Sequence, residues 1–190
     1  DQTYHNWQEK APEGFRYVLK APRIVTHRKY LKDANGDIRQ FWRSVNLLRE
    51  KFGLILLQLA PATPYEPDRL KHALQTFADP SKIAVEFRKD VWFTDEIKNL
   101  LEQLSSVFCN ADSPKTSLND WLTSGTAYLR LHGRKKWYAY NYSNEELKEI
   151  AQLAIEYSGR GVKQVYIFFN NDFEGYAVKN AITLKEMLAV

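Results

Sequence analysis

Several side chains that could transfer protons or hold an anion stand in closely spaced pairs. Glu86 precedes Arg88 by two residues, and Arg130 precedes His132 by two residues. Because side chains alternate along a strand, each pair points to one face of a sheet. A carboxylate or imidazole in a water-poor site serves as a general acid or base, and arginine holds carboxylates or phosphates through two parallel hydrogen bonds. The pairs predict acid–base chemistry on a small anionic or phosphorylated substrate.

The same alternation predicts an inward polar residue near the C-terminal end of each of six apolar segments. Asn110 and Asp112, for example, are expected to face the same way as Arg130. Parallel strands gather their C-terminal ends on one side of a barrel, so we expect one shared site. The predicted catalytic residues are Lys20, Glu86, Asp112 and His132, and the predicted substrate-binding residues are Arg23, His27, Gln58, Arg88, Arg130, Tyr138, Asn170, Asn171 and Asp172.

Two alternatives to acid–base chemistry stay open for these residues. Glu86 with Arg88 or Arg130, and Asp112 with Lys20, could be ion pairs that only close the fold. Glu86, Asp112 and His132 could instead converge on a divalent metal, as in phosphodiester hydrolases or sugar isomerases, although the neighbouring cations would repel it. No organic cofactor is evident.

A third function class is nucleic-acid binding. Two loops combine basic residues with aromatic ones: His27–Lys29 with Lys32, and Arg134–Lys136 with Trp137 and Tyr138. Basic residues beside aromatic rings suit single strands, because lysines meet phosphates and rings stack on bases.

The elements that must position these residues alternate along the chain. The predicted strands are Phe15–Ala21, Leu54–Leu59, Ile83–Phe87, Val107–Ala111, Ala127–Leu131 and Val165–Phe169. They are apolar on both faces, as is typical of parallel strands. The segments between most of them carry helical periodicity, including a capping box that begins at Ser143 and a last helix over about 174–188. This alternation predicts an α/β fold, either an open doubly wound sheet or a closed barrel, and the polar strand ends favour the barrel.

Composition bounds the class of protein. The chain has 190 residues, a formal net charge of +4 and one cysteine, Cys109. The mild positive charge favours anionic partners without being a nucleic-acid signature by itself. A single cysteine excludes an internal disulfide and fits a reducing cytoplasm, and no apolar run is long enough to span a membrane. The sequence therefore predicts a cytoplasmic protein with no membrane contact, of undetermined oligomeric state.

Short motifs in a characteristic order cover nearly the whole chain. They are Pro12–Phe15, Lys20–Arg23 with Thr26 and His27, Gln58–Pro61, Val85–Arg88, Ala111–Pro114, Arg130–Arg134 with Trp137 and Tyr138, Tyr142–Ser143 with Glu145–Leu147, and Phe169–Asp172 with Gly175, Ala177 and Asn180. In order and spacing they closely resemble the YecE-like domain-of-unknown-function family.

The resemblance implies a TIM-barrel-like (β/α) barrel with parallel strands and outer helices. Family members begin with two further strand–helix units, whose Gly-Thr-Ser-Gly-Trp and Glu-x-Asn-x-Thr-Phe-Tyr motifs do not occur in this sequence. Residues Tyr4–Lys10 resemble the end of the second family helix. We therefore expect residues 1–190 to form a single barrel domain that is N-terminally truncated, with six of eight units visible. The resemblance implies no established activity.

Overall fold

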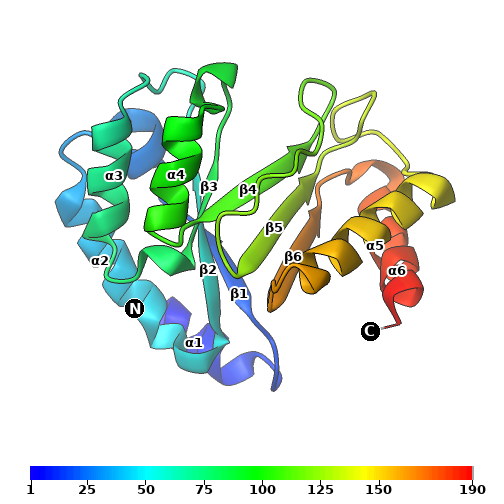
Figure 1. Ribbon diagram of the computed structural model, residues 1–190. Helices are drawn as coiled ribbons and strands as arrows, with labels where there is room; N and C mark the ends of the chain where they lie inside the picture. The colour runs from blue at the N-terminus through cyan, green and yellow to red at the C-terminus, as the bar shows by residue number, and fades with distance from the viewer. Residues whose placement is uncertain (190) are drawn as a thin grey trace. The chain divides into compact units, whose positions relative to one another are not determined.

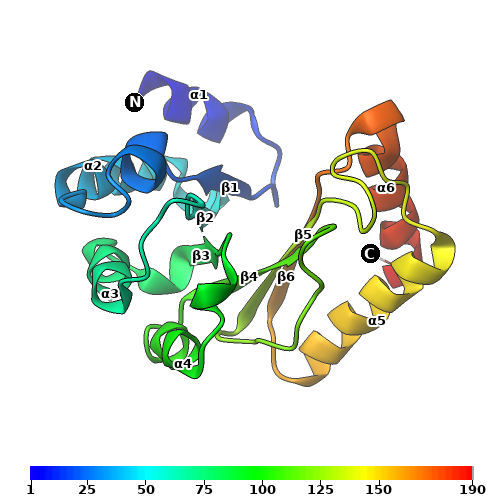
Figure 2. The same ribbon diagram turned by 90° about the horizontal axis from the view of Figure 1, so that it is seen from above.

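The structure is a computed structural model that describes residues 1–189, and the chain divides into two compact units. Unit 1 is Asp1–Val107 and unit 2 is Phe108–Val190. In each unit, helices lie along a face of a sheet of parallel strands (Figures 1 and 2). The predicted α/β class with parallel strands is confirmed at this level, whereas closure into a single barrel domain stays a prediction.

Unit 1 alternates strands and helices after a first helix. Its elements are α1 (Gln2–Lys10), β1 (Tyr17–Lys20), α2 (Asn35–Val45), β2 (Phe52–Gln58), α3 (Pro67–Thr76), β3 (Ile83–Glu86) and α4 (Asp95–Gln103). Strand β2 pairs in parallel with β1 on one side and with β3 on the other. The C-terminal ends of the three strands therefore lie along one edge.

Local sequence explains the helices of unit 1. Pro67 opens α3, where its fixed φ suits the first turn. The Thr94 hydroxyl caps α4 by accepting a hydrogen bond from the Ile97 N–H at 3.3 Å. The apolar stripes that predicted these helices are buried, with Leu70 and Leu101 at 0% exposure. Burial of these stripes fixes the helices against the sheet that carries the polar strand ends.

Unit 2 places three strands beside two helices. Its elements are β4 (Val107–Asp112, which begins at the unit boundary), β5 (Thr126–Leu131), α5 (Asn144–Gly159), β6 (Gln164–Phe169) and α6 (Tyr176–Leu188). Strand β5 pairs in parallel with both β4 and β6. All six predicted strands and the predicted helices exist, with ends displaced by a few residues.

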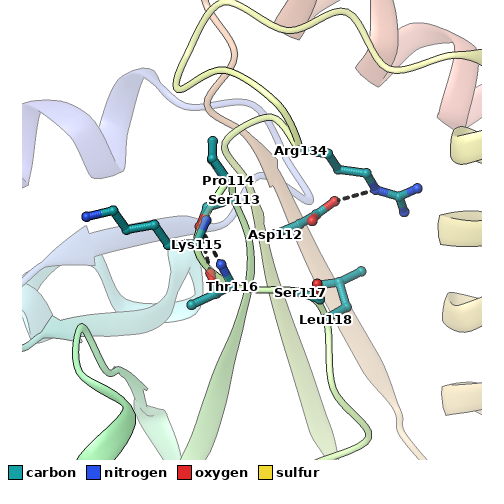
Figure 3. Close-up of a pocket in the computed structure, with 8 residues that line it drawn as sticks. All are labelled: Asp112, Ser113, Pro114, Lys115, Thr116, Ser117, Leu118 and Arg134. Carbon is teal, nitrogen blue, oxygen red and sulfur yellow. Dashed lines mark hydrogen bonds and ion pairs between the residues drawn. The ribbon is translucent and has the colours of Figure 1, made fainter.

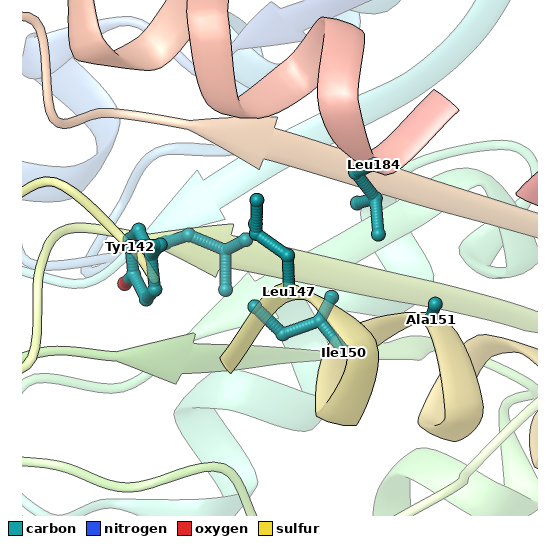
Figure 4. Close-up of a cluster of buried hydrophobic side chains, with 6 residues drawn as sticks. Tyr142, Leu147, Ile150, Ala151 and Leu184 are labelled. Carbon is teal, nitrogen blue, oxygen red and sulfur yellow. The ribbon is translucent and has the colours of Figure 1, made fainter. Parts of the chain in front are cut away.

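The helices of unit 2 pack on β5 through an apolar cluster. Leu131 and Tyr142 meet Leu147 and Ile150 of α5 and Leu184 of α6, with Ala151 beside them (Figure 4). The predicted capping box is present, because the Ser143 hydroxyl accepts from the Glu146 N–H and the Glu146 carboxylate accepts from the Ser143 N–H. This cap fixes where α5 begins relative to the end of β5.

The connection from β4 to β5 contains no helix over residues 113–125. Asn110 holds this segment against the sheet: its Oδ1 accepts from the Asn119 N–H at 3.0 Å and its Nδ2 donates to the Asn119 carbonyl at 2.6 Å. Leu118 and Leu122 then pack with Leu129 and Tyr157. Irregular chain thus takes the place that a crossover helix occupies elsewhere in the fold. Among residues 1–189, no helix has the length and apolar character needed to cross a membrane.

Candidate functional site

Polar side chains share one face at the C-terminal edge of unit 1. Lys20 pairs with Leu56, and Leu56 pairs with Ala84, so these residues lie at one level on one face. Two residues further along, Gln58 pairs with Glu86 on the same face. The alternation predicted for the first three strands is therefore correct within unit 1.

Glu86 is the buried carboxylate of this edge. Its side chain is 1% exposed, and its Oε1 accepts from Gln58 Nε2 at 3.0 Å and from Arg88 Nη2 at 2.9 Å. A buried charge needs such partners, because desolvation of an unpaired carboxylate is costly. The ion pair between Glu86 and Arg88, which the sequence left open as an alternative to a site, exists, and it fixes the carboxylate beside a cation that is itself 25% exposed.

His27 lies in the segment after β1, and the charges of three cations act on it. Burial lowers the pKa of His27, and the positive charges of Arg23, Lys20 and Arg88 lower it further. The Thr26 hydroxyl lies 2.8 Å from His27 Nδ1, which orients the ring. Lys20, Arg23, His27 and Arg88, the last of which pairs with Glu86, are called the unit 1 cationic cluster from here on. Such a concentration of positive charge favours a bound anion.

The register of unit 2 corrects one prediction. Arg130 pairs with Ala111 and with Phe168, whereas Asp112 pairs with Leu131. Neighbours in a parallel ladder point to the same face, so Asp112 lies on the face opposite Arg130. Asn110 has the same parity as Asp112 and reaches the Tyr157 hydroxyl of α5 at 3.2 Å. The expectation that Asn110 and Asp112 face the same way as Arg130 is wrong.

Asp112 instead belongs to a network on the helix side of β4 and β5. The Arg134 Nε donates to Asp112 Oδ2 at 3.0 Å, and its Nη1 contacts Glu146 at 3.3 Å and Glu149 at 2.9 Å. Arg134 comes from the loop after β5, and Lys115 points away from the pair (Figure 3). A cavity of about 480 Å³ adjoins the network, lined by Asp112, Ser113, Pro114, Lys115, Thr116, Ser117, Leu118 and Arg134.

The titration behaviour of this network follows from burial. Burial raises the pKa of Asp112, although the Arg134 guanidinium and the Tyr142 hydroxyl oppose the shift. Burial and then the charge of Asp112 raise the pKa of Tyr142, and burial with a hydrogen bond to Glu146 raises the pKa of Tyr140 to about 12. Both phenols are therefore protonated at neutral pH. Tyr142 also accepts the Gly133 N–H at 2.9 Å, which ties the loop to Asp112.

The other predicted residues of unit 2 lie in the loops after β5 and β6. His132 is 1% exposed and its ring lies 5.5 Å from Trp137 and 5.7 Å from Tyr138. Asn170 directly follows β6, where its N–H donates to the Leu131 carbonyl at 2.7 Å. Asn171 is fully buried and its Nδ2 donates to Tyr140 and Asn180, so this amide holds the loop. Asp172 is exposed.

The predicted metal triad has no counterpart within a unit. Over residues 1–189, no group of three or more His, Cys, Asp or Glu side chains is arranged to hold a metal ion. The basic loops also differ from expectation, because Arg134 is held by three carboxylates and Lys29 pairs with Asp37 at 2.6 Å. Sequence reasoning missed Tyr142 as a hydrogen-bond partner of Asp112 and Glu146 as a partner of Arg134, although the capping-box pattern had already placed Glu146 at the start of α5.

The comparisons with known proteins converge on one family. The family model described as protein of unknown function DUF72 matches residues 1–190. A DUF72 family protein from Thermotoga maritima has a crystal structure similar to this chain, with a TM-score of 0.87, 30% identity, and coverage of 100% of this chain and 79% of that one.

Two crystal structures of a DUF72 family protein from Enterococcus faecalis V583 are also similar. Each is 22% identical and covers 100% of this chain, with TM-scores of 0.82 and 0.78 and coverage of 80% and 84% of their own chains. At this identity the likeness concerns the fold alone. Comparison with the curated proteins gave no match.

Proposed function

This chain, we propose, is an enzyme that binds a small anionic substrate at the unit 1 cationic cluster. The chain belongs to the DUF72, or YecE-like, family of proteins of unknown function. The observations that carry the proposal are the positive charges of Arg23, Lys20 and Arg88 that act on His27, and the ion pair of Arg88 with the buried Glu86. A phosphorylated or carboxylated compound is the substrate class that this charge favours.

The two arginines of the unit 1 cationic cluster are the groups that would bind the anion. Arg88 is fixed by Glu86 at 2.9 Å and stays partly exposed, so it can present its remaining donors to an oxyanion. Arg23 is exposed at the end of β1 and supplies a second fixed charge. The positive charges of both arginines would attract a phosphate.

Glu86 and His27 are the proton-transfer candidates of the cluster. Lowering of its pKa keeps the His27 imidazole neutral near pH 7, which is the form that accepts a proton. Hydrogen bonds from Gln58 and Arg88 fix the orientation of the Glu86 carboxylate, whereas a carboxylate on the surface would be mobile. Lys20 and, in unit 2, His132 and Asp112 remain the other predicted catalytic residues.

The finer statements about fold and setting are also proposals. Closure into a TIM-barrel-like fold is supported by the parallel strands and by the polar strand ends. The metal-dependent hydrolase or isomerase alternative has no observation in its favour. Cytoplasmic location rests on the single cysteine.

Inorganic phosphate is the probe that tests the binding half of the proposal. We expect calorimetry to detect phosphate binding, and Arg23→Gln to weaken it about tenfold, because one charge-assisted contact contributes about 1.5 kcal/mol. Arg69→Gln is the matched control, since Arg69 lies on α3 and pairs with Glu66 at 2.6 Å. Equal phosphate affinity in the two variants would contradict the proposed site.

Turnover tests the catalytic half. In a screen of phosphorylated compounds, we expect Glu86→Gln to lower kcat by about 10²–10⁴ for any compound that is turned over, while phosphate binding persists. A compound turned over equally by the wild type and Glu86→Gln would remove Glu86 from the mechanism.

A further inference from the structure

Exposed aromatic rings gather at the loops that follow β5 and β6. Tyr138 is 50% exposed and Phe173 is 53% exposed. The Phe173 N–H donates to the Tyr138 carbonyl at 3.1 Å, so the two loops are joined at these residues. Trp137 lies 5.8 Å from Tyr138, and Tyr176 lies 6.1 Å from Phe173, ring centre to ring centre. Trp137, Tyr138, Phe173 and Tyr176 are called the aromatic platform below.

Backbone conformation holds these rings where they are. Tyr138 has φ +62° and Glu174 has φ +50°, which is the left-handed region that residues other than glycine rarely adopt. The Tyr138 N–H donates to the His132 carbonyl at 2.9 Å, and the Tyr176 hydroxyl donates to Glu174 at 2.7 Å. Such conformations cost free energy and persist because surrounding contacts fix them. The exposed rings are thus positioned by the fold and are not a by-product of a loose loop.

Lysines lie beside the platform in the loop after β5 and on α6. Lys135 and Lys136 precede Trp137 and are exposed. Lys179 Nζ lies 5.8 Å from the centre of the Tyr176 ring. Two carboxylates, Asp172 and Glu174, share the second loop, and Glu174 is engaged by Tyr176. Three cations against two carboxylates leave a small excess of positive charge around the platform.

We propose that the aromatic platform binds single-stranded nucleic acid. Bases stack on aromatic faces irrespective of sequence, and flanking lysines meet the phosphates between them. Exposed rings also suit sugar rings, but a neutral carbohydrate gives the lysines nothing to bind. The platform shares no residue with the unit 1 cationic cluster, so this inference is independent of the proposed function.

The test is fluorescence anisotropy with a labelled oligothymidylate of about 15 nucleotides, a length that spans a usual single-strand site. We expect binding at low salt that weakens steeply as salt rises. Tyr138→Leu and Phe173→Leu should each weaken binding about 5- to 100-fold, whereas Tyr138→Phe should keep the wild-type affinity because the stacking face remains.

Ile182→Ser, at a position on α6 that is 55% exposed and outside the platform, is the control for non-specific loss of an apolar side chain. Circular dichroism of each variant checks that it folds. Absence of oligothymidylate binding at low salt would overturn the proposal. So would equal affinity of Tyr138→Leu and Ile182→Ser, or binding of neutral oligosaccharides in place of the oligothymidylate.

Discussion

Gly133→Ala is expected to lower the free energy of unfolding by about 2–5 kcal/mol, the sum of left-handed strain and overpacking. Gly133 has φ +100°, and a Cβ at this position would lie 2.5 Å from Tyr140 Cβ and 2.6 Å from the Lys136 carbonyl oxygen. Backbone atoms cannot move away as the end of a flexible side chain can. The loop must therefore rearrange, and with it the Gly133 N–H that Tyr142 accepts. Urea unfolding measures the loss.

The matched control is Gly159→Ala at the end of α5. Nothing lies within 4 Å of a Cβ at this position, and its φ is not positive. Its stability should change by no more than about 0.5–1 kcal/mol, in the stabilising direction if at all. Equal midpoints for the two variants would show that the turn at Gly133 is not constrained as described.

Arg134→Met is expected to lower the free energy of unfolding by about 2–3 kcal/mol at neutral pH. The substitution keeps apolar contact but leaves the Asp112 carboxylate, which is 5% exposed, without its cation. The loss should be smaller than for a fully buried pair, because the Arg134 side chain is 30% exposed. Arg69→Met is the control, because its partner Glu66 has a side chain that is 45% exposed and stays hydrated without the arginine, so stability should change by less than about 1 kcal/mol.

The pH dependence of this variant has a definite sign. Burial already raises the pKa of Asp112, and removal of Arg134 should raise it further. A carboxyl whose pKa is higher in the folded state binds more protons there, so its contribution to stability is lost as pH rises. The deficit of Arg134→Met should therefore shrink on acidification, and Asp112→Asn should recover part of it. A deficit that grows on acidification would contradict the account.

The strands and helices were easier to predict from the sequence than the side of the sheet to which each polar side chain points. Six strands and their helices followed from apolar periodicity, because burial of one stripe or one run dictates the local structure. The facing of Asp112 did not follow, because parity within β4 depends on its register with β5, and register is a property of two segments. Asn110, which holds residues 113–125 against the sheet, gave no local signal of that role.

The network around Asp112 shows a second limit. Arg134 belongs to a basic run, and the sequence suggested an exposed cation for nucleic acid. Its three carboxylate partners, Asp112, Glu146 and Glu149, lie on β4 and α5. Only folding brings these elements together. Within unit 1 the ion pair of Glu86 with Arg88 could be named from the sequence as an alternative, since the two residues are close along the chain and their contact is local.

The central claim, that the unit 1 cationic cluster binds an anion, is tested most directly by NMR titration of the His27 ring. Burial, and then the charges of Arg23, Lys20 and Arg88, hold the pKa of His27 below its usual value of about 6.5, so phosphate bound beside these cations should raise it. The His27→Gln variant assigns the signal, and the ring signals of His72 on α3 serve as the control. We expect a lowered pKa that rises in phosphate. A His27 pKa that is the same with and without saturating phosphate would contradict the site.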